Sequence, residues 1–280
     1  MPNLATPPPF VRDAVVRALA EDLTPIGDIT SSLLPPDVIG NAKFIARAEG
    51  VLSGADCVDE TFAQTDPEIK VNWLLHEGAE VAVDDVLCEM EGPLASILAG
   101  ERTARNFLAH LCGVATLTRR YVRASQNKTR IRDSRFTTPG LRALEKSAVR
   151  AGGGVNHRGS LSDGILLRDK HLSYISFVDA VRRARLRWPG RFIEIECHTI
   201  NEVAEVLEER PDMILLEGLT PDEAKPIVDM VNGMCPVEVF GAIDLRDVGA
   251  FALAGVDFLS VTTLTQAPPA FEVGFEVKAR

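Results

Sequence analysis

A cluster of positive charge lies in the middle of this chain. Between Arg130 and Lys170 there are nine Lys or Arg residues and four Asp or Glu residues, whereas the 280-residue chain has a formal net charge of −10. A basic segment in an acidic protein is either a solvated surface or a binding site for an anion. Guanidinium groups bind carboxylates and phosphates through paired hydrogen bonds and stay charged when partly buried. The arginines of this segment are therefore candidates for binding a small polyanion.

Three of these arginines, Arg135, Arg158 and Arg168, lie at the ends of short predicted strands. If the strands belong to one sheet, the three side chains converge on one cavity. His157 adds a group that can be neutral or charged near pH 7. The alternative is that each arginine forms an ion pair with an acidic residue close to it, and the sequence leaves this open.

The other predicted strands also end in polar residues. Glu196 and Glu217 suit Mg²⁺, which in proteins takes one or two carboxylates together with substrate oxygens. They would equally serve as counterions of the arginines. Gly241 and Thr262-Thr263 could offer backbone N–H groups to a terminal phosphate.

The second half of the chain alternates short apolar strands with helices. Strands are expected at RIRDS, GILLRD, FIEIE, MILLE, VEVFGA and FLSVTT, which begin near residues 130, 164, 192, 213, 237 and 258. Helices are expected at 200–209, 221–232 and 245–254. This alternation predicts a parallel sheet of β/α units, and the lack of a GxGxxG turn favours a barrel over an open dinucleotide-binding sheet. In β/α barrels the active-site residues lie at the carboxyl ends of the strands, and the polar residues of this sequence lie at those positions.

The first half has a different pattern. An amphipathic helix is expected at 11–23, short β-like runs from Asn41 to Glu91, and a long helix at 97–125 with a break at Gly113. We expect an N-terminal α/β domain at 1–112 and a barrel domain at 113–265. A C-terminal tail at about 266–280 is expected to pack with the N-terminal domain.

Composition and charge argue against several classes of protein. The negative net charge argues against nucleic-acid binding, and no apolar run approaches the roughly 18 residues of a membrane span. The first residues lack the features of a secretory signal. The five cysteines are far apart, form no zinc-binding or redox motif, and fit a reducing cytosol. We therefore expect a cytoplasmic enzyme that binds neither membranes nor nucleic acid.

Several motifs together resemble one enzyme family. They are Asp22-Leu23 with Gly27-Asp28-Ile29-Thr30, ERTARNFL at 101–108, GVAT at 113–116, TTPGLR at 137–142 and GGGVNHR at 152–158. These motifs closely resemble the quinolinate phosphoribosyltransferase family (nicotinate-nucleotide pyrophosphorylase, carboxylating). The resemblance covers almost the whole chain.

The resemblance implies a fold, a reaction and an assembly. The fold is α/β, with an N-terminal α/β sandwich and an incomplete β/α barrel of the type II phosphoribosyltransferase kind. The reaction joins quinolinate to phosphoribosyl pyrophosphate with Mg²⁺, giving nicotinate mononucleotide, pyrophosphate and CO₂ in NAD biosynthesis. The assembly is a homodimer or higher homo-oligomer in which Arg102 enters the neighbouring subunit's active site.

The resemblance also implies roles for residues at matching positions. The catalytic residues would be Arg102, Arg135, Arg168, Glu196 and Glu217, of which Glu196 and Glu217 would hold the metal. The quinolinate clamp would be formed by Arg102, Arg135, His157 and Arg158. Further substrate contacts would come from Ser134, Phe136, Arg168, Lys170, His171, Phe240, Gly241, Ala242, Val261, Thr262 and Thr263.

Some of these positions depart from the family's pattern. The family has lysine, Ser-Gly-Gly, Asp-Asn and histidine where this chain has Phe136, Phe240-Gly241-Ala242, Glu217-Gly218 and Gln266. Phe136 removes a positive charge, and Phe240 adds bulk where a phosphate would approach the backbone. We expect the family reaction in a divergent active site. The alternatives are a paralogous phosphoribosyltransferase for another pyridine or azole carboxylate, and a ligand-binding protein without catalytic activity.

Overall fold

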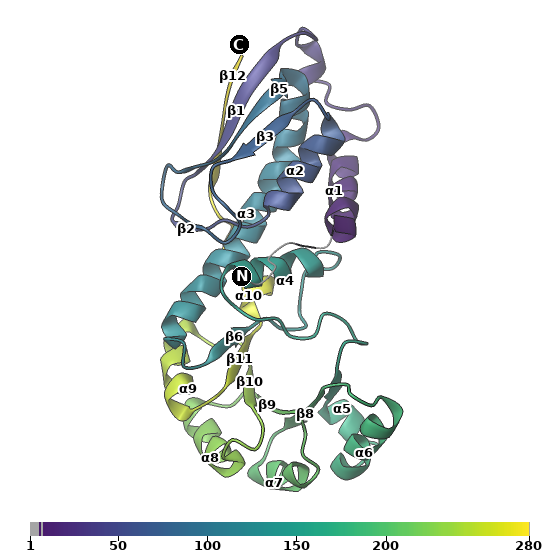
Figure 1. Ribbon diagram of the computed structural model, residues 1–280, viewed down its shortest axis with the longest axis vertical. Helices are drawn as coiled ribbons and strands as arrows, with labels where there is room; N and C mark the ends of the chain where they lie inside the picture. Colours follow the sequence, from purple (N-terminus) through teal and green to yellow (C-terminus); the bar gives the residue numbers. More distant parts are fainter. Residues whose placement is uncertain (1–5, 7, 280) are drawn as a thin grey trace. The chain divides into compact units, whose positions relative to one another are not determined.

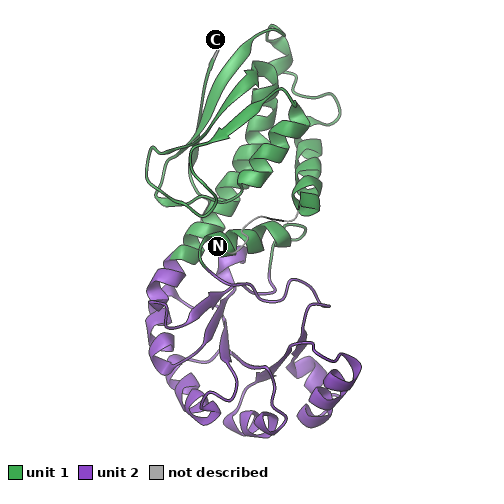
Figure 2. Ribbon diagram, viewed as in Figure 1, with its two compact units in different colours: residues 1–119, 137–153, 267–280 green, residues 120–136, 154–266 purple. Residues whose placement is uncertain are grey.

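The computed structural model of the chain describes residues 6 and 8–279, which form two compact units (Figure 2). Unit 1 contains the residues up to 119, residues 137–153 and the residues from 267 onwards, and unit 2 contains residues 120–136 and 154–266. The predicted domain boundary at 112/113 falls inside helix α3 (Leu94–Ser125) and stays a prediction. The first residues, on which the expectation of a chain without a secretory signal depends, lie outside the described residues.

Unit 1 is built on a four-stranded antiparallel sheet, with α2 (Ala55–Thr65) and α3 on one of its faces (Figure 1). The strand order is β12 (Val273–Ala279), β1 (Ile39–Ala46), β5 (Val86–Pro93) and β3 (Lys70–Trp73). The short strands β2 (Gly50–Val51) and β4 (Glu80–Val81) form a second sheet. Helices α1 (Pro8–Leu23) and α4 (Arg142–Ala151) and the 3-10 turn η1 (Ser31–Leu33) complete the unit.

The two-residue alternation of the strands decides which face of this sheet is buried. In β5, Cys88 and Met90 are buried against the helices, whereas Glu89 and Glu91 are exposed. The core between sheet and helices includes Phe44, Phe62, Leu87, Ile97 and Leu108, all fully buried. Burying a side chain of this size stabilises a fold by about 1.5–3 kcal/mol.

Helix α3 runs without interruption from Leu94 to Ser125, so the expected break at Gly113 is wrong. Glycine weakens a helix by only about 1 kcal/mol relative to alanine, and the packing of a long helix outweighs this cost. Glycine is required at 113 for another reason: a Cβ atom there would overlap the carbonyl oxygen of Pro269. Gly113 therefore marks the place where the C-terminal segment passes close to the helix.

Unit 2 is a parallel sheet of six strands that curves into an incomplete barrel (Figure 1). The order is β6 (Arg130–Arg132), β11 (Phe258–Val261), β10 (Val237–Gly241), β9 (Met213–Glu217), β8 (Ile193–Cys197) and β7 (Ile165–Leu167). Its helices are α5 (Asp169–Leu172), α6 (Phe177–Arg187), α7 (Ile200–Glu208), α8 (Pro221–Val231), α9 (Val248–Ala254) and α10 (Thr263–Gln266), and the 3-10 turn η2 (Leu245–Asp247) precedes α9. The predicted fold class is confirmed.

The barrel is open between its two edge strands. β6 and β7 do not pair with each other within the described residues. The helix that follows β6 in the chain, α4, belongs to unit 1. Val155 forms a parallel bridge with Arg132 beside β6. This bridge places the GGGVNHR motif at the edge of the sheet.

Helix caps hold the loops that follow β8 and β9. α7 begins at a capping box of Thr199 and Glu202, and α8 begins at one of Thr220 and Glu223. Such a cap satisfies backbone N–H groups at the start of the helix and stabilises it by about 1 kcal/mol. The two loops are short, so these caps also restrain the ends of the strands that carry Glu196 and Glu217.

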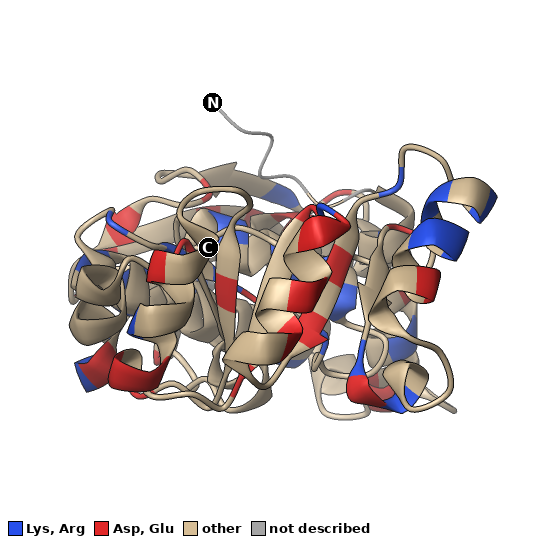
Figure 3. Ribbon diagram, turned by 90° about the horizontal axis from the view of Figure 1, so that it is seen from below, with Lys and Arg blue, Asp and Glu red and all other residues tan. Residues whose placement is uncertain are grey.

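The surface carries both signs of charge. Lys and Arg positions are spread along the ribbon together with Asp and Glu positions (Figure 3). Helix α6 carries four arginines. Among residues 6 and 8–279 there is no helix that is long and apolar enough to cross a bilayer.

Candidate active site

Arg168 joins the two acidic residues that the sequence predicts to bind a metal. Arg168 follows β7 directly, and Glu196 and Glu217 lie at the ends of β8 and β9. Nε of Arg168 donates a hydrogen bond of 2.9 Å to Oε2 of Glu196, and its Nη2 lies 3.8 Å from Oε2 of Glu217. This guanidinium group is therefore paired with local acids, as the alternative interpretation expects.

Arg135 is held differently, by two aromatic rings. Its guanidinium carbon lies 5.5 Å from the ring centroid of Phe136 and 5.6 Å from that of Phe240, and the two rings stack at 6.1 Å. Within the described part of the chain Arg135 forms no ion pair. Aromatic faces attract a guanidinium group but leave its N–H edge free for hydrogen bonds. Arg135 is therefore oriented without being neutralised.

Arg135 interacts electrostatically with four other residues of the predicted site. Burial lowers the pKa of Arg135, and the positive charges of Arg168 and Arg158 lower it further, while Glu196 and Glu217 oppose this change. The three guanidinium groups thus repel one another, and two carboxylates balance them only in part. A bound anion relieves this repulsion, so the arrangement suits a polyanionic ligand.

An apolar layer lies next to these charges inside the barrel. It consists of the buried cluster Leu166, Leu215 and Phe240, from β7, β9 and β10. Leu166 precedes Arg168 by two residues and Leu215 precedes Glu217 by two, so each pair points to the same side of the sheet. The charged groups therefore lie next to an apolar layer that limits their access to water, and a lower local dielectric strengthens their electrostatic interactions.

The remaining predicted substrate-binding residues of unit 2 differ in burial and in the hydrogen bonds that they form within the protein. Thr262 donates both its hydroxyl, at 2.8 Å, and its backbone N–H, at 3.3 Å, to the carbonyl oxygen of Gly241. Nδ1 of His171 accepts the backbone N–H of Arg168 at 3.1 Å. The other predicted residues comprise Ser134 and Val261, which are buried, Thr263, which is half-buried, and Lys170 and Ala242, which are exposed. Their contacts with substrate stay predictions.

Both halves of the chain match the same family of proteins. The family models for the C-terminal and N-terminal domains of quinolinate phosphoribosyl transferase match residues 114–276 and 28–112. The chain belongs to the quinolinate phosphoribosyltransferase family. The sequence resemblance to this family is therefore confirmed.

Relatives in this family match over almost the full length. The nicotinate-nucleotide pyrophosphorylase (carboxylating) of Mycobacterium leprae is 34% identical, with 95% of this chain and 96% of the relative covered. Quinolinate phosphoribosyltransferase (decarboxylating) 1b of Nicotiana tabacum is 30% identical, with 95% and 82% covered. The solved structure of the nicotinate-nucleotide pyrophosphorylase from Francisella tularensis superposes with a TM-score of 0.93 at 33% identity, covering 98% of both chains.

Arg102, which the family resemblance assigns to a neighbouring subunit's site, lies in unit 1 on α3. Its side chain is 75% exposed, and Nη1 lies 3.4 Å from Oδ1 of Asp22. Thr103, the next residue, donates its hydroxyl to the other carboxylate oxygen of Asp22 at 2.8 Å. Two of the family motifs, Asp22-Leu23 and ERTARNFL, therefore meet at this carboxylate. The assignment of Arg102 to a shared site stays a prediction.

His157 is almost fully buried, although the resemblance implies that it binds quinolinate. It is 4% exposed, its Nδ1 accepts the backbone N–H of Arg158 at 2.8 Å, and its Nε2 lies 3.0 Å from Oε2 of Glu194. Arg158 donates its Nη1 proton to the carbonyl oxygen of Gly164 at 2.9 Å. Nδ1 of His157 is thus hydrogen-bonded within the protein, whereas Nε2 is buried beside the carboxylate of Glu194 in an arrangement that does not meet hydrogen-bond geometry.

Three charged residues inside the barrel were not predicted from the sequence: Arg132, Glu194 and Glu238. Each lies two residues away from a predicted site residue, on the same side of its strand. Burial raises the pKa of Glu238, and repulsion by Glu194 adds to this, so that the pKa is about 7. The alternation of charge and apolar residues in RIRDS, FIEIE and VEVFG was the available signal, because strands buried on both faces are usually apolar throughout.

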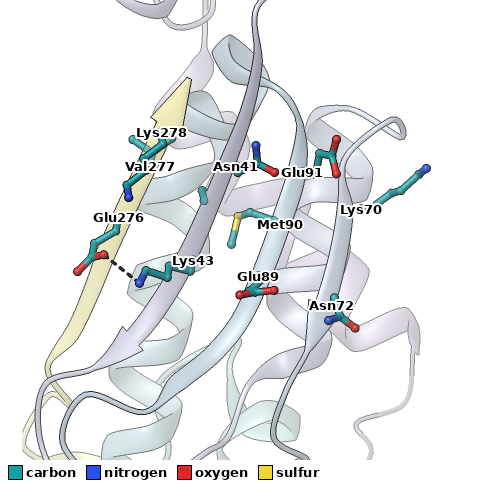
Figure 4. A pocket seen from close by; sticks show the side chains of 11 residues that line it. Asn41, Lys43, Lys70, Asn72, Glu89, Met90, Glu91, Glu276, Val277 and Lys278 are labelled. Atoms are coloured by element: carbon teal, nitrogen blue, oxygen red, sulfur yellow. Dashed lines mark ion pairs between the residues drawn. The ribbon is translucent and has the colours of Figure 1, made fainter. Parts of the chain in front are cut away.

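A separate hollow of about 380 Å³ lies on the sheet face of unit 1 that the helices leave uncovered (Figure 4). Its lining carries both signs of charge, from residues such as Lys70, Glu89 and Glu91. Lys43 forms an ion pair of 3.1 Å with Glu276 across this face. The charges of this hollow are mixed and exposed, in contrast to the cationic cluster of unit 2, so the latter is the candidate active site.

Proposed function

We propose that this chain is a quinolinate phosphoribosyltransferase (decarboxylating). It transfers the phosphoribosyl group of phosphoribosyl pyrophosphate to quinolinate and releases pyrophosphate and CO₂, giving nicotinate mononucleotide for NAD biosynthesis. The observation that carries this proposal is the cluster of Arg135, Arg158 and Arg168 in a chain that its family models match along both domains. Quinolinate has two carboxylates on adjacent ring carbons, and guanidinium groups are suited to bind them.

Arg135 and Arg158 hold the two carboxylates of quinolinate in this proposal. Arg135 has a free N–H edge, and Nε of Arg158 is buried without a hydrogen-bond partner among the described residues. A buried donor without a partner costs free energy until a ligand satisfies it. Both groups are therefore arranged to gain hydrogen bonds when the dicarboxylate binds.

The substitution at the sugar then proceeds from this position. The pyridine nitrogen forms a bond to the anomeric carbon of the ribose while the bond from that carbon to pyrophosphate breaks, and the sugar gains cationic character in between. Glu196 and Glu217 stabilise that positive charge, and Arg168 neutralises charge on the departing pyrophosphate. Holding both reactants in place supplies a large part of the rate enhancement.

Decarboxylation requires no further base. After the nitrogen is alkylated, the ring is a pyridinium cation, and it accepts the electron pair that remains when the carboxylate next to the nitrogen leaves as CO₂. A proton from solvent then replaces the carboxylate on that carbon. The role of Arg135 and Arg158 in this step is to orient the carboxylates.

Glu196 and Glu217 are the proposed holders of Mg²⁺. Both are carboxylates at the ends of adjacent strands and are joined through one guanidinium group, and oxygen donors of this kind are the ligands that Mg²⁺ takes together with substrate oxygens. When bound, Mg²⁺ supplies charge neutralisation for the pyrophosphate. The proposal extends to a homodimer or higher homo-oligomer whose neighbouring subunit supplies Arg102. All five cysteines are free and buried, which supports a cytoplasmic location.

The aromatic pair of Phe136 and Phe240 favours an alternative acceptor in place of quinolinate. The family resemblance places a lysine and a serine at these positions. Replacing a cation by an apolar ring reduces the attraction for a dianion and favours an acceptor with fewer charges. The alternative function is therefore phosphoribosyl transfer to another pyridine or azole carboxylate.

The test is pyrophosphate release by the purified chain with phosphoribosyl pyrophosphate and a panel of acceptors. Quinolinate, nicotinate and an imidazole carboxylate form the panel, with Mg²⁺ present or removed by EDTA. Release with quinolinate together with equimolar CO₂, and its loss in EDTA, are the expected results. Release with nicotinate but not quinolinate supports the alternative, and binding without release for every acceptor overturns the enzymatic proposal.

A further inference from the structure

Four ionisable side chains lie together inside the barrel of unit 2. His157, Glu194 and Glu238 are buried, and one nitrogen or oxygen atom of each lies within 4.8 Å of the others. Arg132 contacts Oε2 of Glu238, and its Nη1 lies 3.7 Å from Oε1 of Glu194. Charged groups are costly to bury unless they are paired, so this buried cluster calls for an explanation.

The hydrogen bond between His157 and Arg158 fixes the tautomer of the histidine. The donor is the backbone N–H of Arg158, so Nδ1 of His157 must be the acceptor and carries no proton. The neutral ring therefore has its proton on Nε2, which faces Oε2 of Glu194 at 3.0 Å. Nδ1 is therefore not available to a substrate, and Nε2 is buried against the carboxylate of Glu194, so this arrangement differs from the substrate-binding role that the family resemblance implies.

The backbone around His157 is held from the other side as well. Oδ1 of Asp133 accepts the backbone N–H of His157 at 2.7 Å, and Oδ2 accepts the side-chain amide of Asn156 at 2.6 Å. The segment that ends in Arg158 is thus fixed by one buried carboxylate at its backbone and by a second, Glu194, at the imidazole ring. Arg158 follows His157 directly, and its charge interacts with that of Arg168.

We propose that the buried cluster of Arg132, Glu194 and Glu238 acts through His157 to position Arg158 for the anionic substrate. This inference rests on the proposed function, because it takes Arg158 to bind a substrate carboxylate. The four residues are positioning residues and touch no reacting atom. Arg132 balances the charge of Glu194, Glu238 holds Arg132 in place, Glu194 orients the imidazole ring, and Nδ1 of that ring holds the backbone of Arg158.

A divalent metal is the competing occupant of the cluster, since a histidine and two carboxylates could bind one. Arg132 argues against it. Its guanidinium group already contacts one of the carboxylates and lies beside the other, so it supplies the positive charge that a metal would bring. A second cation at this place would be repelled by the first. Metal content of the purified protein decides between the two occupants.

The test uses three substitutions of His157, which separate its contact with the N–H of Arg158 from its contact with Glu194. Asparagine places an oxygen close to the position of Nδ1 and can still accept the N–H of Arg158. Glutamine places an amide close to the position of Nε2 and can still donate to Glu194, but it offers no acceptor at the Nδ1 position. Leucine preserves neither contact. The control is His76→Gln, an exposed histidine in unit 1 outside the candidate site.

The expected result is a graded loss of quinolinate binding. KM for quinolinate stays within about threefold of the parent for His157→Asn, rises on the order of tenfold for His157→Gln, and rises further for His157→Leu, while kcat changes less than KM. Glu238→Gln, which preserves an oxygen for Arg132, is expected to raise the same KM by a smaller factor. Thermal midpoints identify any variant that is unfolded. Equal KM values across the three His157 variants, or a KM for His157→Leu equal to the parent's, overturn the proposal.

A measurement that does not depend on activity separates this proposal from the proposed function. Nitrogen-15 spectra of the imidazole rings, with the His157 signals identified by their loss in His157→Gln, are expected to show the Nε2–H tautomer from pH 5 to 8. A doubly protonated or Nδ1–H ring contradicts the proposal, whether or not quinolinate is turned over. One equivalent of tightly bound metal, lost in Glu238→Gln, also overturns it.

Discussion

The guanidinium group of Arg135 lies over the ring of Phe240, with its central carbon 5.6 Å from the ring centroid. Phe240 is itself buried in the apolar layer of the barrel, so the ring is a rigid support. The exposed ring of Phe136 lies against the same guanidinium group, at 5.5 Å. This aromatic support orients the cation without pairing it with an acid, whereas Arg168 contacts two carboxylates. The two arginines therefore contribute differently to anion binding.

Arg135→Lys should strongly reduce activity although it preserves the charge. An ammonium group cannot offer two parallel hydrogen bonds, and it stacks poorly on two rings. We expect kcat/KM for quinolinate to fall on the order of 10²–10³-fold in an assay of pyrophosphate release. The thermal midpoint should change little, because Arg135 forms no ion pair within the described residues.

The matched control for this variant is Arg182→Lys. Arg182 lies on α6, is largely exposed, and pairs with Glu209 at 2.9 Å. Exposed ion pairs contribute about 0–1 kcal/mol, so this variant should retain both activity and stability. If Arg135→Lys behaves like Arg182→Lys, Arg135 does not bind the substrate.

Phe136→Lys tests whether the aromatic pair limits the affinity for quinolinate. The side chain of Phe136 is 43% exposed and lies beside Arg135, so a lysine there would add a positive charge to the cluster. We expect KM for quinolinate to fall severalfold, and we expect the preference for quinolinate over nicotinate to increase. Phe136→Leu is the control, since it removes the ring without adding charge. No gain in quinolinate turnover for Phe136→Lys would count against quinolinate as the natural acceptor.

The sequence predicts the strands and helices of unit 2 well, because each strand is a short apolar run between helices. It also predicts that Arg135, Arg158, Arg168 and Glu196 lie near one another, because parallel strands end at one edge of a sheet; these groups interact electrostatically, and their shared pocket stays a prediction. It could not predict how each arginine is held. Whether a guanidinium group pairs with an acid, as Arg168 does, or stacks on rings, as Arg135 does, depends on side-chain directions that only the packed barrel determines.

Two further features were hidden for related reasons. Arg132 and Glu238 are 106 residues apart in the chain and become partners only when β6 and β10 are placed in one barrel. Gly113 resembles a helix breaker because its local cost is visible in the sequence, whereas its close approach to Pro269 is not. In both cases a contact between distant segments decides the outcome.

Glu238 should make the stability of the protein depend on pH. Its pKa is about 7 in the folded state because of burial and of repulsion by Glu194, and the ordinary value is 4.5. Between pH 4.5 and 7 the folded protein therefore binds a proton that the unfolded chain releases. The free energy of unfolding should fall as pH rises through this window and should level off above it.

Glu238→Gln isolates this contribution, because glutamine does not titrate and can still accept a hydrogen bond from Arg132. As pH rises from 4.5 to 7, the free energy of unfolding of the parent should fall by about 1–3 kcal/mol relative to that of the variant. Denaturant titrations at pH 4.5, 5.5, 6.5 and 7.5 measure it. Parallel curves for the two proteins would show that Glu238 is not protonated in the folded state.

Gly113→Ala should destabilise unit 1, although alanine is the better helix former. Its Cβ atom would overlap the carbonyl oxygen of Pro269, so the C-terminal segment or α3 must shift. Overpacking of this kind costs about 1–3 kcal/mol, which exceeds the gain of about 1 kcal/mol in helix propensity. Gly249→Ala in α9 is the matched control, because its Cβ atom would meet no atom within 4 Å, and there the propensity gain should raise the thermal midpoint. Opposite changes in the midpoints of the two variants are expected, whereas stabilisation by both would mean that the segment at Pro269 adapts at no cost.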